Sequence, residues 1–76
     1  MIEWHGTDRL TLGNRIAAAR IKAGIRQAEL TKRAGMKPSL LGEIERGLAP
    51  CSIGQLARIA EGVGLPTSAL KEGPQI

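Results

Sequence analysis

The chain has 76 residues, a net charge of +4, a single cysteine and neither tyrosine nor phenylalanine. A chain of this length forms one domain with a thin core, which excludes a deep substrate cavity with its supporting shell. Cys51 has no partner for an internal disulfide, and no apolar run approaches the length of a membrane span. Since the first residues also lack the order of a signal peptide, we expect a cytoplasmic protein without membrane contact.

The positive charge is concentrated in the middle of the chain. Residues 9–46 carry nine Lys or Arg and three Glu, whereas residues 1–8 carry two acids and residues 47–76 are neutral overall. Such an asymmetry is typical of a fold that presents one basic face to a polyanion. Many small domains carry a basic face without a ligand, so charge alone leaves the function open.

Apolar residues recur at helical spacing, and glycine or proline separates each periodic segment from the next. The pattern predicts an all-α fold, a compact bundle of four to five short helices, with no segment that reads as a strand. The expected helices are residues 12–23 with Thr11 as the cap, 27–34, 38–46, about ten residues after the cap Ser52, and a weak last turn at 67–71.

One apolar stripe from each segment should form the core. The residues expected to face inward are Leu12, Ile16, Ala19, Ala23, Leu30, Thr31, Ala34, Leu41, Ile44, Ile53, Leu56, Ile59, Ala60, Val63, Leu65 and Leu70, with Met36 as a buried plug. Cys51 is expected to be a small buried residue in a loop.

The most informative segment is residues 27–47. Its two helices are joined by Gly35-Met36-Lys37, a connection too short for an antiparallel hairpin and typical of a crossing near about 90–120°. The second helix would be supported from behind by Leu41 and Ile44. Its outer face would then present short or polar groups, namely Lys37, Pro38, Ser39, Gly42, Glu43 and Arg46.

These residues resemble a known family. Arg20-Ile-Lys-Ala-Gly-Ile-Arg-Gln-Ala-Glu-Leu, then Thr-Lys-Arg-Ala-Gly-Met and Leu-Gly-Glu-Ile-Glu-Arg-Gly, are similar to the lambda-repressor-like, Cro-type helix-turn-helix family (the XRE family). The resemblance covers roughly Leu12 to Leu70. It implies a DNA-binding domain at 11–72, between an N-terminal arm at 1–10 and a tail at 73–76, with helix 38–46 in the major groove.

The resemblance also implies roles for single residues. Gln27 would bond a phosphate and support the recognition helix. Arg20 and Glu45 would form a structural ion pair between the first helix and the end of the recognition helix. Bases would be read by Pro38, Ser39 and Glu43, and phosphates would be held by Arg26, Lys37 and Arg46.

The sequence departs from the family pattern at several positions. Lys37 replaces the usual capping Ser or Thr, and Pro38 replaces a base-reading amide. Gly42 lowers helix propensity by about 1 kcal/mol, and residues 48–51 lack the lysine or arginine that often clamps phosphate in relatives. Affinity per monomer should therefore be low. Glu43 is as consistent with a solvated carboxylate as with base readout.

Two functions remain open on the sequence. The first is a repressor-like transcriptional regulator that binds a pseudo-palindromic operator as a homodimer, with half-sites about 34 Å apart. The dimer would form through the C-terminal helical end, with Leu65, Pro66, Leu70 and Trp4. The second is a protein-interaction or antitoxin-like adaptor domain that retains the fold.

The sequence does not suggest an enzyme. His5 is the single histidine, and no pattern of metal ligands, nucleophile with base, or phosphate-binding glycine loop is present. We therefore expect no cofactor, no metal and no small-molecule substrate.

Overall fold

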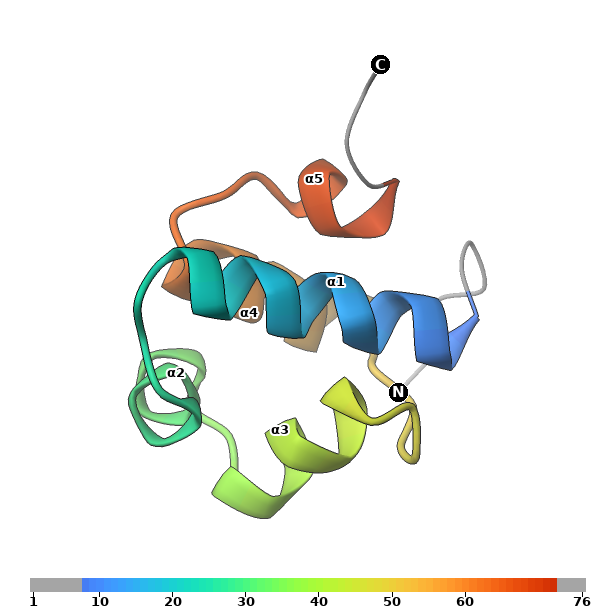
Figure 1. Ribbon diagram of the computed structural model, residues 1–76, viewed down its shortest axis with the longest axis horizontal. Helices are drawn as coiled ribbons and strands as arrows, with labels where there is room; N and C mark the ends of the chain where they lie inside the picture. The colour runs from blue at the N-terminus through green and yellow to red at the C-terminus, as the bar shows by residue number, and fades with distance from the viewer. Residues whose placement is uncertain (1–7, 73–76) are drawn as a thin grey trace.

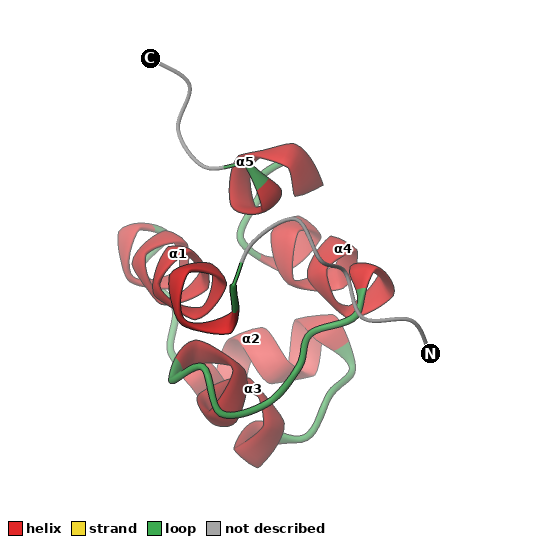
Figure 2. Cartoon of the chain, turned by 90° about the vertical axis from the view of Figure 1, so that its right-hand side faces the viewer, coloured by secondary structure: helices red, strands yellow, loops and turns green. Residues whose placement is uncertain are grey.

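The computed structural model describes residues 8–72, which form five helices. They are α1 (Arg9–Lys22), α2 (Gln27–Ala34), α3 (Pro38–Glu45), α4 (Ile53–Gly62) and α5 (Thr67–Lys71). In Figures 1 and 2, α5 lies on one side of α1 and α4, whereas α2 and α3 lie on the opposite side. The all-α prediction is confirmed. Within the described part of the chain, none of the helices combines the length and apolarity needed to cross a bilayer.

α1 begins at Arg9, earlier than expected, because Asp8 and not Thr11 is its cap. The Asp8 carboxylate accepts the backbone N–H of Thr11 at 2.9 Å and its hydroxyl at 2.8 Å. The prediction that Thr11 caps the helix is therefore wrong. Of the residues assigned to the N-terminal arm, Arg9 and Leu10 are helical and Asp8 is the cap, whereas residues 1–7 lie outside the described residues.

The turn after α2 depends on Gly35, which has a φ of +65°. Its N–H donates to the carbonyl of Lys32 at 3.4 Å, and the N–H of Met36 donates to the carbonyl of Thr31 at 3.0 Å. This pair of bonds satisfies two carbonyls at the helix end and requires the left-handed conformation that glycine adopts without strain. The backbone conformation of the short connection between α2 and α3 is therefore restricted by these bonds.

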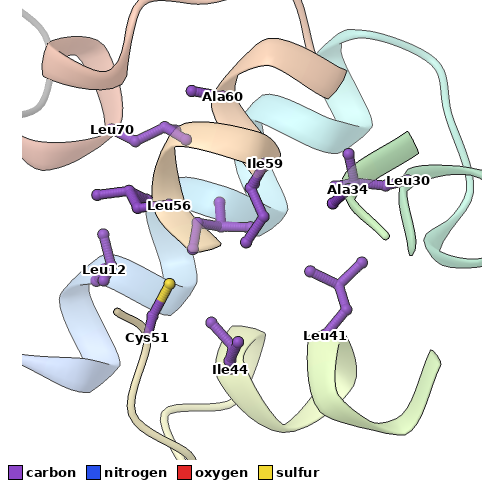
Figure 3. Packing of buried hydrophobic residues seen from close by; sticks show 11 residues of the cluster. Leu12, Leu30, Ala34, Leu41, Ile44, Cys51, Leu56, Ile59, Ala60 and Leu70 are labelled. Atoms are coloured by element: carbon purple, nitrogen blue, oxygen red, sulfur yellow. The ribbon is translucent and has the colours of Figure 1, made fainter. Parts of the chain in front are cut away.

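The core is one cluster to which all five helices contribute (Figure 3). Its buried members are Leu12, Ile16, Leu30, Ala34, Leu41, Ile44, Cys51, Leu56, Ile59, Ala60 and Leu70. Three residues expected in the core are exposed instead. Ile53, the first residue of α4, is 44% exposed, Leu65 in the α4–α5 turn is 39% exposed, and Ala23 at the end of α1 is exposed. Met36, expected to be fully buried, is only half-buried because it lies in the exposed α2–α3 connection.

α4 begins as the sequence predicts. The Ser52 hydroxyl accepts the N–H of Gln55 at 3.1 Å, and the Gln55 side chain accepts the N–H of Ser52 at 3.0 Å. This reciprocal capping box satisfies two groups that the helix itself leaves unpaired. It fixes the residue at which the loop after α3 ends and α4 begins.

Candidate nucleic-acid interface

α3 is held from its inner side and presents its other side to solvent. Leu41 and Ile44 point from α3 into the core and are almost fully buried (Figure 3). The side chains on the opposite side are exposed, namely Lys37, Pro38, Ser39 and Glu43. α3 ends at Glu45, one residue earlier than expected, with Arg46 as its exposed C-cap.

The start of α3 has no side-chain cap. Lys37 occupies the capping position without such a hydrogen bond, and Pro38 follows as the first helical residue. The N–H groups of Leu40 and Leu41 both donate to the carbonyl of Lys37, at 3.0 and 3.4 Å. Backbone bonds therefore close the first turn, and Pro38 has no N–H that would need a partner.

Gly13 allows α1 to approach α3 unusually closely, a contact that the sequence does not predict. A Cβ atom built on Gly13 would lie 2.5 Å from the carbonyl oxygen of Glu45 and also collide with that of Ile44. Any larger residue would therefore push the end of α3 away from α1. Glycine inside a predicted helix is a weak sign of such a contact, because a tertiary approach leaves no local pattern.

The buried carboxylate of Glu45 joins three helices. Arg20 Nε donates to Glu45 Oε2 at 2.7 Å, and Arg20 Nη2 donates to Oε1 at 3.2 Å. Gln27 Nε2 donates to the same Oε1 at 2.8 Å. The Glu45 side chain is 6% exposed and that of Arg20 is 15% exposed, so these charge-assisted bonds lie largely out of water. Gln27 thus connects the start of α2 to the end of α3.

Gly42 was expected on the outer face, but the structure contradicts this. Gly42 is buried, because the long side chains of Arg46 and Gln27 extend over it. A Cβ atom built there would lie 3.5 Å from Arg46 Nη1, 3.9 Å from Arg46 Nη2 and 3.9 Å from Gln27 Nε2.

Three exposed cations flank the helices of the helix-turn-helix segment, because Arg26 directly precedes α2, Lys37 directly precedes α3 and Arg46 directly follows α3. Arg26, Lys37 and Arg46 are exposed, and none of them pairs with a carboxylate of residues 8–72. Arg33 has a different role. It donates to the Gly62 carbonyl at 2.8 Å and pairs with Glu29 at 2.5 Å, so it ties α2 to the end of α4.

The buried thiol of Cys51 carries no catalytic signal. Burial raises the pKa of Cys51 to about 11, so the thiol stays protonated at neutral pH. The residue contributes to the core as expected.

A groove of about 600 Å³ lies between α1 and α5. α5 and α3 lie on opposite sides of α1 (Figures 1 and 2). Leu65 lines its rim, and the neighbouring Pro66 is exposed. Leu70, expected in the dimer surface, is only 2% exposed because it packs into the core. Trp4, the remaining residue assigned to that surface, lies outside the described residues.

Comparisons with known proteins agree with this architecture. A profile described as helix-turn-helix domain matches residues 11–72. No curated protein gives a significant match. Among solved structures, the restriction-modification controller protein C.AhdI from Aeromonas hydrophila superposes with a TM-score of 0.81 at 25% identity, covering 83% of this chain and 96% of that one.

Two further structures widen the comparison to other regulators. The clp gene regulator ClgR from C. glutamicum has a TM-score of 0.82 at 25% identity and covers 95% of this chain and 90% of its own. The P22 c2 repressor, solved with a synthetic operator, has a TM-score of 0.75 at 28% identity, with 83% and 96% covered. The chain therefore belongs to the helix-turn-helix domain family, among the lambda-repressor-like, Cro-type (XRE) regulators.

Proposed function

We propose that this protein is a sequence-specific regulator of transcription, repressor-like, that inserts α3 into the major groove of double-stranded DNA. The observation that best supports this proposal is the position of α3. Its inner side is buried through Leu41, Ile44 and Glu45. Ser39 and Glu43 are exposed to solvent. A helix that is supported from behind and polar in front is suited to contact base edges.

Ser39 and Glu43 are four residues apart and therefore share one face of α3. A serine hydroxyl can donate to a base or accept from it, and a glutamate can accept from the exocyclic N4 of cytosine. Pro38 offers an apolar contact beside them. We propose that these three residues read sequence. The phosphate-holding set is Arg26, Gln27, Lys37 and Arg46.

We further propose that the protein binds a pseudo-palindromic operator as a homodimer in the cytoplasm. α3 has eight residues, so a single copy can contact few base pairs. A second copy would double the recognised sequence and the number of phosphate contacts. The exposed Leu65 and Pro66 beside the α1–α5 groove are the proposed contact surface.

Selection of binding sites from random duplex DNA tests this function. We expect one enriched sequence with two-fold symmetry, bound orders of magnitude more tightly than unselected duplex, and with an affinity that falls steeply with salt. An unenriched pool together with a flat salt dependence would contradict DNA readout and favour an adaptor domain that retains the fold.

A further inference from the structure

We propose that residues 1–7 dock into the groove between α1 and α5 of their own chain, with the Trp4 indole against the small side chains that line it. The sequence alone predicts Trp4 at a surface between two copies, whereas this docking site lies within one chain. The site goes beyond the proposed function, because the groove borders α5, on the opposite side of α1 from α3 (Figures 1 and 2).

The groove has the size and the lining of a site for an aromatic side chain. Its volume of about 600 Å³ falls within the roughly 300–1,000 Å³ that is typical of ligand pockets. Much of its wall is made by alanine and leucine side chains, namely Ala18, Ala19, Leu65, Ala69 and Leu70. The alanines leave the space open because each side chain is a single methyl group. A groove with such walls favours an apolar occupant over water.

The chain enters α1 at one end of this groove. Asp8 directly follows the segment, and its carboxylate accepts the hydroxyl of Thr11, a residue of the groove wall, at 2.8 Å. The four residues from Asp8 back to Trp4 span at most about 14 Å when extended. The helix from Asp8 to Ala18 rises about 15 Å. A segment that runs back along α1 therefore brings the long Trp4 side chain beside Ala18.

The segment also matches the groove in apolarity and in charge. Met1, Ile2 and Trp4 are apolar, and Glu3 is the single acid of residues 1–7. Lys22 lines the groove in the last turn of α1, is exposed and pairs with no carboxylate of residues 8–72. With Trp4 beside Ala18, the Glu3 carboxylate comes within reach of the Lys22 ammonium group. An exposed pair of this kind adds little affinity but favours this direction of the segment.

The tryptophan is its own probe. Trp4 is the single tryptophan and the chain has no tyrosine, so the intrinsic fluorescence reports this residue alone. We expect the folded protein to emit at a shorter wavelength than the chain unfolded in urea, and acrylamide to quench it less, because the docked indole is shielded from water. Emission and quenching equal to those of the unfolded chain would overturn the proposal.

A variant that fills the groove tests where the indole lies. Ala18→Gln adds a long side chain at an exposed position of the groove wall, and glutamine is a good helix former. The Trp4 emission should shift to longer wavelength, and circular dichroism establishes that the variant is folded. Ala57→Gln is the matched control at an exposed position of α4 outside the groove and should emit like the parent. A folded Ala18→Gln variant with the parent's emission would overturn the proposal.

Dilution separates docking within one chain from burial by a second copy. The Trp4 emission should keep its wavelength from concentrations at which sedimentation detects a dimer down to those at which only monomer remains. A shift to longer wavelength in step with the loss of dimer would show that a second copy covers Trp4, and would overturn the proposal. None of these measurements involves DNA, so docking of residues 1–7 and base readout by α3 can fail independently.

Discussion

Gly13 in α1 lies against the backbone of Ile44 in α3, closer than any residue with a side chain allows. The contact is made by the last turn of α3, next to the carboxylate of Glu45 that Arg20 and Gln27 hold. α3 is thus positioned at its end by a backbone contact and by an ion pair. The backbone contact and the ion pair together set the distance between the outer side of α3 and the rest of the domain.

Gly13→Ala is expected to lower the free energy of unfolding by about 2 kcal/mol, since backbone carbonyls cannot move aside as a flexible side chain can. Urea denaturation measures the loss. Gly54→Ala is the matched control, because a Cβ there would meet only the Ser52 hydroxyl at 3.9 Å and alanine favours the helix. Equal stability of the two variants would contradict the close approach of α1 and α3.

Arg20→Met should destabilise the protein by about 3 kcal/mol, because it leaves the Glu45 carboxylate buried without its counter-charge. Replacing both residues, as Arg20→Met with Glu45→Leu, should recover most of that loss. Urea denaturation of the two variants measures the difference. An Arg20→Met variant as stable as the parent would mean that the pair does not matter to the fold.

The stability contributed by Asp8 should depend on pH. Hydrogen bonds from the backbone N–H and then the hydroxyl of Thr11 lower the pKa of the Asp8 carboxyl. A lowered pKa in the folded state means that this stabilisation is complete above the unfolded value of about 3.9 and is lost as the pH falls through the folded value.

Asp8→Ala should therefore have a lower Tm than the parent at pH 7, and the two Tm values should converge in acid. Asp8→Asn is the control, because asparagine can cap the helix but does not titrate in this range. A Tm difference that persists unchanged in strong acid would exclude the charged cap as its source.

Lys37→Ser should stabilise the protein and weaken DNA binding at the same time. Serine at the start of α3 can accept a first-turn N–H, which should raise the free energy of unfolding by about 0.5–1 kcal/mol. The lost charge should reduce the salt slope of duplex binding by about 0.9 per monomer. Lys32→Ser, at an exposed position in the last turn of α2, removes the same charge without creating a cap. Weaker duplex binding by Lys32→Ser alone would contradict the assignment of Lys37.

The elements that could be predicted are those with local signals. α2 was predicted with its correct bounds, because its polar start and the glycine after Ala34 are both visible in the sequence. The cap at Ser52 was also predicted, because a serine directly before an apolar helical stripe is a local signal, whereas the part of Gln55 in the capping box was not predicted. The predicted start of α1 was three residues too far along the chain. Asp8 and Thr11 are both residue types that cap helices, and the spacing of the apolar residues favoured Thr11.

The features that were missed depend on contacts between helices. The close approach at Gly13 requires the packed position of α3, which no local pattern reports. Gly42 was assigned to the outer face from its helical phase, but side chains of Gln27 and Arg46 cover it. Leu65 was assigned to the core from its apolarity, although it lies in an exposed turn.

The central claim is that the outer side of α3 reads bases. Its most direct test is competition of every single-base variant of the selected operator against the parent and against Glu43→Ala, with Glu61→Ala as an exposed control on α4. The parent and Glu61→Ala should show the same preferences, whereas Glu43→Ala should lose about 1–3 kcal/mol of discrimination at one base pair in each half-site. A Glu43→Ala protein with the parent's preference at every position would contradict the claim.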